Sequence, residues 1–370
     1  MTKEKKKTKD SGSWILLIIV SALTGGVAGI FYPDMDFSFQ LFDILILVAA
    51  FILSLPIHVI LHEVGHLIGG KLSGYDFIMF RLFNTIWIKT DDGISRRRQV
   101  VQGILGQALM APPEDEENPP FLIYHLGGVI VNLLTAILLL IIANTLTSSL
   151  LQMILVVSAG SALLLFVLNI VPMKPNDGYN IVHQIKNPEA TTEMTNVLRL
   201  YAEMVKGKPF SEIQHAIYID KIGSFTEPNN VTLYTYKAAA YFEQLDFQGA
   251  REIYADLWEE RAALLEMHKP DVFLNYLFSL LMTDPFHPDV ATIKETKIYK
   301  NFHTMKVADT LRVFAAEAIY IEGDFSKAKA YLVEGRPMID KAPTITEENL
   351  EHLLYDHLER EIARLEIETD

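Results

Sequence analysis

Long apolar segments in the first half of the chain restrict its possible folds more than any other feature. Residues 14–32, 41–72, 121–146 and 150–171 are almost entirely apolar. A helix needs about 20 such residues to cross a bilayer, and a backbone in lipid has to satisfy its hydrogen bonds internally. The sequence therefore predicts four transmembrane helices.

Charge is distributed unevenly between the two halves. Residues 1–178 carry 14 acidic and 12 basic side chains, whereas residues 179–370 carry 32 and 20. This difference predicts a membrane-embedded first half and a soluble, acidic second half. An acidic surface disfavours nucleic acid as a partner. The chain has no cysteine, so a bound metal would have nitrogen and oxygen ligands.

Lysine and arginine placement predicts the orientation of the spans. Residues 1–13 contain five of these residues and residues 71–120 contain six, whereas the connections 33–40 and 147–149 contain none. By the positive-inside rule, both termini are cytoplasmic in a multi-pass protein of the cell membrane. The basic tail resembles the start of a signal peptide, but 14–32 is long for one and Phe31-Tyr32-Pro33 lacks small residues for cleavage. We therefore expect an uncleaved span.

These patterns divide the chain into four parts. They are a cytoplasmic basic tail (1–13), a first transmembrane helix (14–32), a membrane core (41–178, with spans 41–72, 121–146 and 150–171 and a β segment and linker at 73–120) and a cytoplasmic helical domain (179–370). The fold class expected is an all-α polytopic membrane protein with one small β-hairpin and a soluble helical domain.

The β segment is predicted from Tyr75–Lys89, which is rich in aromatic and β-branched residues and precedes the turn Asp91-Asp92-Gly93. It should form one or two strands. Two interpretations stay open: a small cytoplasmic hairpin, or an edge strand that pairs with an extended substrate.

Two stretches of the second half resemble each other. Ala238–Tyr254 and Glu317–Leu332 both place Asp-Phe-x-x-Ala between two amphipathic segments, with Ala250 and Ala328 offset by 78 residues. The pattern resembles the helix–turn–helix of tetratricopeptide repeats, although any antiparallel helical bundle can produce two such matches. Glu347–Glu368 is predicted to be a terminal amphipathic helix.

The motif His62-Glu63-Val64-Gly65-His66 lies inside the second apolar segment. Its two imidazoles are one helical turn apart, so both can bind one zinc ion, and Glu63 would act as general base on the metal-bound water. Burying these side chains in lipid is costly unless they are paired or bound to a metal. Their position therefore favours a metal site over a polar helix-packing cluster.

Asp177 is the candidate third ligand. It follows the last span in Asn169–Gly178, a segment interrupted by Pro172 and Pro175. Irregular backbone near the membrane is tolerated where it lines protein or a cavity. Because the predicted topology brings this segment and the histidines to the cytoplasmic side, we expect a three-ligand zinc site there. The alternative is that Asp177 only caps a turn in a cytoplasmic loop.

Together these motifs resemble the site-2 protease family of intramembrane zinc metalloproteases. That family combines an HExxH helix, a Gly-x-x-x-Asn helix and an Asn-x-x-Pro segment leading to Asp-Gly. Here they are His62–His66, Gly128–Asn132, Asn169–Pro172 and Asp177-Gly178, in the same order between Leu41 and Gly178. Asn176 departs from the leucine usual in the family, and no PDZ domain fits between the last two spans.

The resemblance implies zinc held by His62, His66 and Asp177, with Glu63 as catalytic base and transmembrane peptide segments as substrates. It also implies that Tyr75–Lys89 forms a membrane-associated sheet near the active site. It covers none of the helical domain, so it predicts nothing about that domain's role.

Other polar residues in the spans have weaker interpretations. Asn132 and Asn169 either bind substrate or the oxyanion, or only bridge helices. His58 is expected to support the site or pack helices, because a fourth protein ligand would close the site to water. His125 is interpreted as an interfacial residue.

The sequence thus predicts an intramembrane zinc endopeptidase that cuts membrane proteins, signal-peptide remnants or small peptide precursors. The expected partners are these substrates, the lipid bilayer and a protein bound by the helical domain. One alternative is a non-catalytic membrane scaffold that binds a partner through its helical repeats, against which the intact Glu63 argues. A small ion transporter is a second alternative, which four spans without inverted repeats disfavour.

Overall fold

A computed structural model describes residues 41–90, 93–98, 105–114, 119–213 and 224–369. The basic tail and the first predicted span, 14–32, lie outside these residues. The chain divides into two compact units, each made of two separate stretches. The first unit comprises Met1–Tyr75 and Pro120–Pro188, and the second comprises Asp76–Pro119 and Glu189–Asp370.

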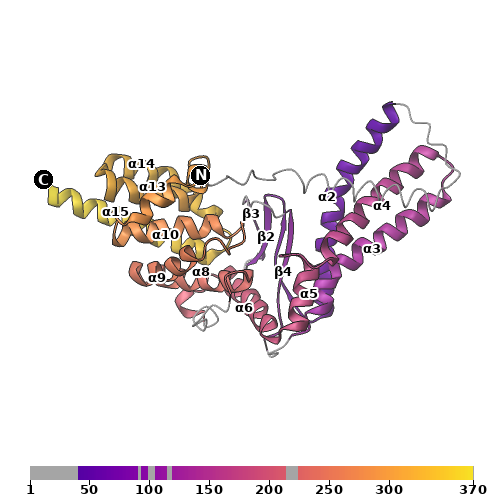
Figure 1. Cartoon of the computed structure of the whole chain (residues 1–370), viewed down its shortest axis with the longest axis horizontal. Helices are drawn as coiled ribbons and strands as arrows, with labels where there is room; N and C mark the ends of the chain where they lie inside the picture. Colours follow the sequence, from indigo (N-terminus) through magenta and orange to yellow (C-terminus); the bar gives the residue numbers. More distant parts are fainter. Residues whose placement is uncertain (1–40, 91–92, 99–104, 115–118, 214–223, 370) are drawn as a thin grey trace, which may run out of the picture. The chain divides into compact units, whose positions relative to one another are not determined.

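The first unit is built from α2 (Leu41–Leu72), α3 (Leu122–Thr145), α4 (Ser149–Ile170) and the shorter α5 (Asp177–Lys186). The three long helices pack against one another (Figure 1). Each is long and apolar enough to cross a membrane, which confirms three of the predicted helices. Leu53, on α2, is 66% exposed, as expected of a side chain that faces lipid rather than water.

Glycines allow α2 and α3 to approach closely. A Cβ added to Gly127 would lie 2.2 Å from the carbonyl oxygen of Gly65, and one added to Gly69 would lie 2.3 Å from that of Ile123. Small residues at a helix interface allow this backbone contact. The contact fixes α2 against α3 beside His66.

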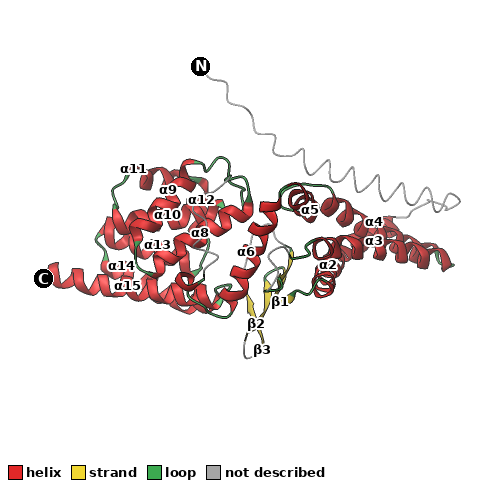
Figure 2. Cartoon of the chain, turned by 90° about the horizontal axis from the view of Figure 1, so that it is seen from below, coloured by secondary structure: helices red, strands yellow, loops and turns green. Residues whose placement is uncertain are grey.

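A four-stranded antiparallel sheet belongs to the second unit. Its strands are β1 (Asp76–Leu82), β2 (Thr85–Thr90), β3 (Gly93–Arg98) and β4 (Gly106–Ala111), in the spatial order β3-β2-β1-β4. Figure 2 shows strands of this sheet in yellow among the helices, which are red. The predicted hairpin is therefore incomplete. β3 has the sequence GISRRR, which lacks alternation of apolar and polar residues, and it forms by pairing with the edge of β2.

The sheet packs with helices of the second unit, whereas the sequence patterns grouped these strands with the predicted membrane core of 41–178. Ile78, Ile86 and Ile88 form a buried cluster with Val205, the last residue of α6 (Pro188–Val205). One face of a sheet has to be buried against another element, and here Val205 and its neighbours provide that cover. Polar contacts add to it: Arg97 donates to Glu348 (2.7 Å) and to the carbonyl of Ala342 (3.0 Å), and Arg199 donates to the carbonyl of Pro113 (2.9 Å).

The rest of the second unit is helical. Its described helices, in chain order, are α6 (Pro188–Val205), the 3-10 turn η1 (Phe210–Glu212), α8 (Pro228–Glu243), α9 (Phe247–Glu259), α10 (Lys269–Thr283), α11 (Pro288–Glu295), α12 (Lys297–Phe302), α13 (Ala308–Glu317), the π-helical turn η2 (Ala318–Glu322), α14 (Phe325–Gly335), the 3-10 turn η3 (Arg336–Lys341) and α15 (Ile345–Thr369).

Both similar stretches of the sequence form a helix, a turn and a second helix. Asp246 caps α9 by accepting from the Gly249 amide, and Asp324 caps α14 by accepting from the Lys327 amide. Ala250 and Ala328 are fully buried, as expected where paired helices pack closely. The predicted terminal helix is also present as α15, with its leucines turned inward.

Glu347 at the start of α15 is expected to make the stability of the second unit, called the helical unit below, depend on pH. Tyr236 and Thr344 donate to its carboxylate at 3.2 and 2.8 Å. Burial nevertheless raises the pKa of Glu347 to about 7, and the negative charge of Asp271 adds to this effect. Because the folded-state pKa is above that of the unfolded chain, ionisation destabilises the fold increasingly as pH rises from about 4.5 to 7.

We therefore expect the Glu347 carboxyl to contribute about 1 kcal/mol of added stability when the pH falls from 8 to 6. Asp271, whose pKa burial raises to about 6, adds to this gain, whereas His268, whose pKa burial lowers to about 4, opposes it. Hydrogen exchange of α8 and α15 in the full chain, corrected for the intrinsic pH dependence of exchange, measures this change. The variant Glu347→Gln carries no charge at this position, so the difference in pH dependence between the wild type and this variant should equal the contribution of Glu347. An undiminished dependence in Glu347→Gln would assign it to other groups.

Candidate metal centre

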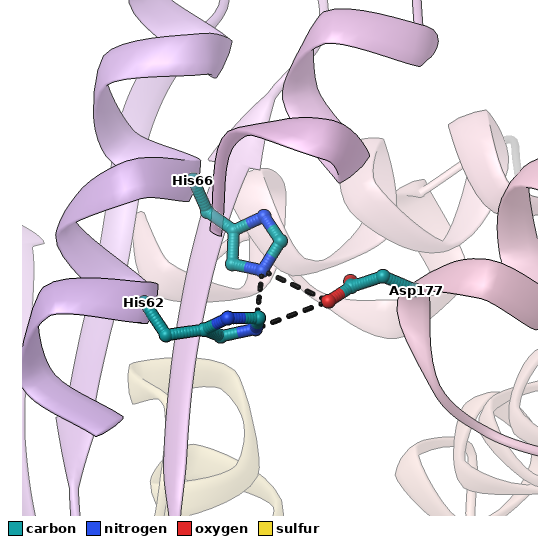
Figure 3. Close-up of side chains that lie close together, drawn as sticks. All are labelled: His62, His66 and Asp177. Atoms are coloured by element: carbon teal, nitrogen blue, oxygen red, sulfur yellow. Dashed lines mark hydrogen bonds and ion pairs between the residues drawn. The ribbon is translucent and has the colours of Figure 1, made fainter. Parts of the chain in front are cut away.

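Three side chains of the first unit converge on one point (Figure 3). His62 and His66 lie on one face of α2, and their Nε2 atoms are 3.1 Å apart. The Oδ2 atom of Asp177, the first residue of α5, lies 3.1 Å from Nε2 of His62 and 3.3 Å from Nε2 of His66. Both histidines are 7% exposed. These three atoms form a compact, buried set of possible metal ligands.

The separations fit a tetrahedral metal ion. Metal bonds of about 2.0–2.1 Å place neighbouring ligand atoms about 3.3 Å apart in such a site, and the observed values are 3.1, 3.1 and 3.3 Å. Three electron-rich atoms at this distance repel one another unless a cation or protons lie between them. The donor set, two imidazole nitrogens and one carboxylate oxygen, is typical of a catalytic zinc site with an open fourth position.

Hydrogen bonds orient both imidazoles for this role. Nδ1 of His66 donates to the carbonyl of Tyr124 at 2.8 Å, which leaves Nε2 free to bind a metal. Nδ1 of His62 lies 3.1 Å from the side-chain amide of Asn132. The two ends of an amide have the same shape, so the Asn132 oxygen can accept the His62 Nδ1 proton. Outer partners of this kind fix the tautomer and direction of metal-binding histidines.

Gly128 keeps the space beside the imidazoles open. A Cβ at this position would lie 2.6 Å from Nε2 of His66 and 2.7 Å from Nδ1 of His62. Glycine therefore allows α3 to pass directly against both imidazoles. The spacing Gly128–Asn132 has a structural meaning here, because one residue gives the imidazoles space and the other orients His62.

Asn176 positions Asp177. Its side-chain oxygen accepts from the amides of Tyr179 (2.9 Å) and Met173 (3.1 Å), and its nitrogen donates to the carbonyls of Leu168 (2.5 Å) and Val171 (2.6 Å). It thus caps α5 and ties it to the end of α4. The departure from leucine at this position is therefore part of the support for Asp177. In addition, Gly178 packs against the carbonyl of Ile170, where a Cβ would lie at 2.2 Å.

The surroundings of Asp177 favour its ionised form. Burial raises the pKa of Asp177, but the positive charge of protonated His66 and the neighbouring imidazoles of His125 and His62 outweigh burial and hold the pKa well below its ordinary value. A metal ion bound by the two Nε2 atoms would replace the proton on His66 and would keep the carboxylate ionised in the same way.

The other predicted residues have different environments. Glu63 is buried, at 7% exposure, in the helical turn between the two histidines. The side-chain amide of Asn169 donates to the carbonyl of Leu165 in its own helix, at 2.9 Å. Among the described contacts, Asn132 joins the cluster and Asn169 does not. His58 bonds to Ser158 of α4 at 3.0 Å, which agrees with a role in helix packing.

Two residues of the site were missed by sequence reasoning. Gln184 of α5 lies against His125 of α3, with Nε2 atoms 2.9 Å apart, and Nδ1 of His125 faces Oδ1 of Asp177 at 3.9 Å. His125 was interpreted as an interfacial residue; its side chain is 4% exposed and lies between Asp177 and Gln184. No sequence pattern links these two positions.

A second group of possible ligands lies in the helical unit. Asp340, Glu348 and His352 bring their ligand atoms within 4.8 Å of one another. Asp340 is exposed, and Glu348 forms an ion pair with Arg97 at 2.7 Å. A metal ion would have to compete with Arg97, so the buried cluster of the first unit is the better candidate.

Comparisons of the chain with models of protein families, with curated proteins and with solved structures find no match.

Proposed function

We propose that this protein is an intramembrane zinc endopeptidase. The observation that carries the proposal is the convergence of His62, His66 and Asp177 at zinc-ligand spacing, with both histidines on a helix apolar enough to cross a membrane. The order of motifs typical of site-2 proteases supports the same assignment.

The proposed chemistry follows from the residues around the cluster. Zinc bound by His62, His66 and Asp177 would supply an acidified water and a polarised peptide carbonyl. Glu63 would accept a proton from the attacking water and would deliver it to the amine nitrogen as the peptide bond breaks. Asn132 and the carbonyl of Tyr124 hold the two imidazoles in their metal-binding tautomer.

The proposed setting is a cell membrane crossed by four helices, with residues 14–32 as the first. The lysine and arginine distribution supports cytoplasmic termini and a site that opens to the cytoplasm. Substrates are transmembrane segments, signal-peptide remnants or small peptide precursors. The helix pairs α8/α9 and α13/α14 support a tetratricopeptide-like domain that binds a protein partner.

Removal of the metal tests the proposal. We expect the purified full chain to contain about one zinc per molecule. Membranes from cells that produce the protein should generate new peptide termini within or beside membrane segments. A strong zinc chelator should stop their formation, and added zinc should restore it. Quantitative mass spectrometry of peptide termini measures the reaction.

Membranes from cells that lack the protein are the control for other metalloproteases. Peptide termini that form equally in both samples would contradict the protease. Zinc binding without any such termini would favour the scaffold, and the lack of zinc in the purified chain would contradict the metal site itself.

A further inference from the structure

The oxygen of Asp177 that does not point at the histidine pair has its own partner. Oδ2 faces Nε2 of His62 and His66, whereas Oδ1 faces Nδ1 of His125 at 3.9 Å. His125 in turn contacts Gln184, whose amide nitrogen lies 2.9 Å from Nε2 of the ring. His125 and Gln184 are 4% and 5% exposed. Gln184 of α5, His125 of α3 and Asp177 at the start of α5 therefore form a row of three neighbouring side chains.

The contacts define where the protons of His125 lie. If the amide nitrogen of Gln184 donates to Nε2, the ring proton is on Nδ1 and faces Asp177. If the amide were turned so that its oxygen faces the ring, Nε2 would donate to that oxygen, and the bare Nδ1 of the neutral ring would place a lone pair against the carboxylate. The first arrangement avoids this repulsion. It gives Nδ1 a proton directed at Oδ1.

The distance from Nδ1 to Oδ1 is longer than a direct hydrogen bond. At 3.9 Å the N–H of His125 still attracts the carboxylate oxygen electrostatically, and the contact lies at the outer limit of an ion pair. The rest of the residue is held by Asn176 and Gly178, which fix the start of α5. The carboxylate plane is therefore the degree of freedom that remains for His125 to control.

We propose that His125, supported by Gln184, is a positioning residue that makes Asp177 a monodentate ligand through Oδ2. This inference rests on the proposed metal site. Because His125 occupies Oδ1, the carboxylate does not bind the metal with both oxygens. A position on the metal is thereby kept for water or the substrate carbonyl, as a catalytic zinc site requires. The contact with Gln184 keeps the His125 ring oriented so that Nδ1 faces Oδ1 of Asp177.

Substitutions at position 125 test the proposal by metal binding and metal geometry. His125→Leu removes the donor, and His125→Asn keeps an N–H near the position of Nδ1. His58→Leu is the matched control, because His58 is equally buried and also bridges two helices, but contacts Ser158. Zinc affinity is measured on the full chain by competition with a chelator, and coordination is measured by X-ray absorption of bound zinc.

We expect His125→Leu to weaken zinc binding roughly 10- to 100-fold, the usual effect of losing an outer partner, and to raise the number of oxygen ligands. His125→Asn should restore most of the affinity and the wild-type coordination, and His58→Leu should match the wild type in both. Gln184→Leu should give an intermediate loss and serves as the second variant if His125→Leu does not fold.

Two results would overturn the inference while leaving the metal site intact. One is wild-type affinity and coordination in both His125→Leu and Gln184→Leu. The other is an equal loss in His125→Asn, His125→Leu and His58→Leu, which would show only a packing role. Failure of the proposed function is a different result, since the wild-type chain would then contain no zinc.

Discussion

Replacing Asp177 with alanine is expected to abolish zinc binding and all cleavage that depends on it. The substitution removes one of three ligands and the negative charge that faces the two imidazoles. The loss of affinity should exceed the roughly 10- to 100-fold typical of an outer partner. Asn176 and its four hydrogen bonds remain, so α5 should still begin at the same place. The effect can therefore be assigned to the carboxylate.

Zinc per chain after dialysis against a competing chelator measures this prediction. The matched control is Asp340→Ala, because Asp340 belongs to the second group of possible ligands, near the start of α15. We expect Asp340→Ala to keep the full zinc content. The opposite outcome, zinc retained in Asp177→Ala and lost in Asp340→Ala, would move the metal from the first unit to the helical unit.

Replacing Glu63 with glutamine should have the second large effect, on catalysis alone. The amide has the shape of the carboxylate but cannot take a proton from water. Loss of a general base typically slows a reaction by about 100- to 10 000-fold. Glu63 is not one of the three converging ligands, so zinc content should stay at the wild-type level.

Initial rates of formation of the peptide termini, measured at equal zinc occupancy, test this prediction. Glu189→Gln is a suitable control because it makes the same change at an exposed site at the start of α6. Cleavage by Glu63→Gln at the wild-type rate would rule out the proposed base. Loss of zinc together with cleavage would instead indicate that Glu63 maintains the metal site.

The convergence of His62, His66 and Asp177 could be predicted from the sequence, because few arrangements tolerate buried polar side chains in an apolar helix. Two histidines one turn apart in an apolar helix need a cation or partners, and an aspartate at a chain break can supply the third contact. His125 and Gln184 have no such signature. A single histidine near a span end and a glutamine in an amphipathic helix are common, and their meeting depends on how α5 folds back on α3. Asn176 was likewise identified only as a departure from a pattern.

Part of the sheet also could not be predicted from the sequence, because it depends on contacts that form only in the folded chain. Tyr75–Lys89 was predicted as strand because aromatic and β-branched residues favour it. The sequence of β3 carries three arginines in a row and has no strand pattern of its own. It forms because β2 offers an open edge and because Arg97 has partners in the helical unit. Contacts between residues more than 200 positions apart, such as Arg97 with Glu348, cannot be read from local periodicity.

The division of each unit into two stretches has a consequence for the order of folding during synthesis. The ribosome makes the strands at 76–111 before α3 and α4, and long before Val205. Until then the apolar side chains of Ile78, Ile86 and Ile88 lack the cover that α6 gives them. A nascent chain with an exposed sheet is prone to aggregate. The sheet must therefore remain uncovered, or be shielded by a chaperone, until α6 has been made, which is after α3 and α4.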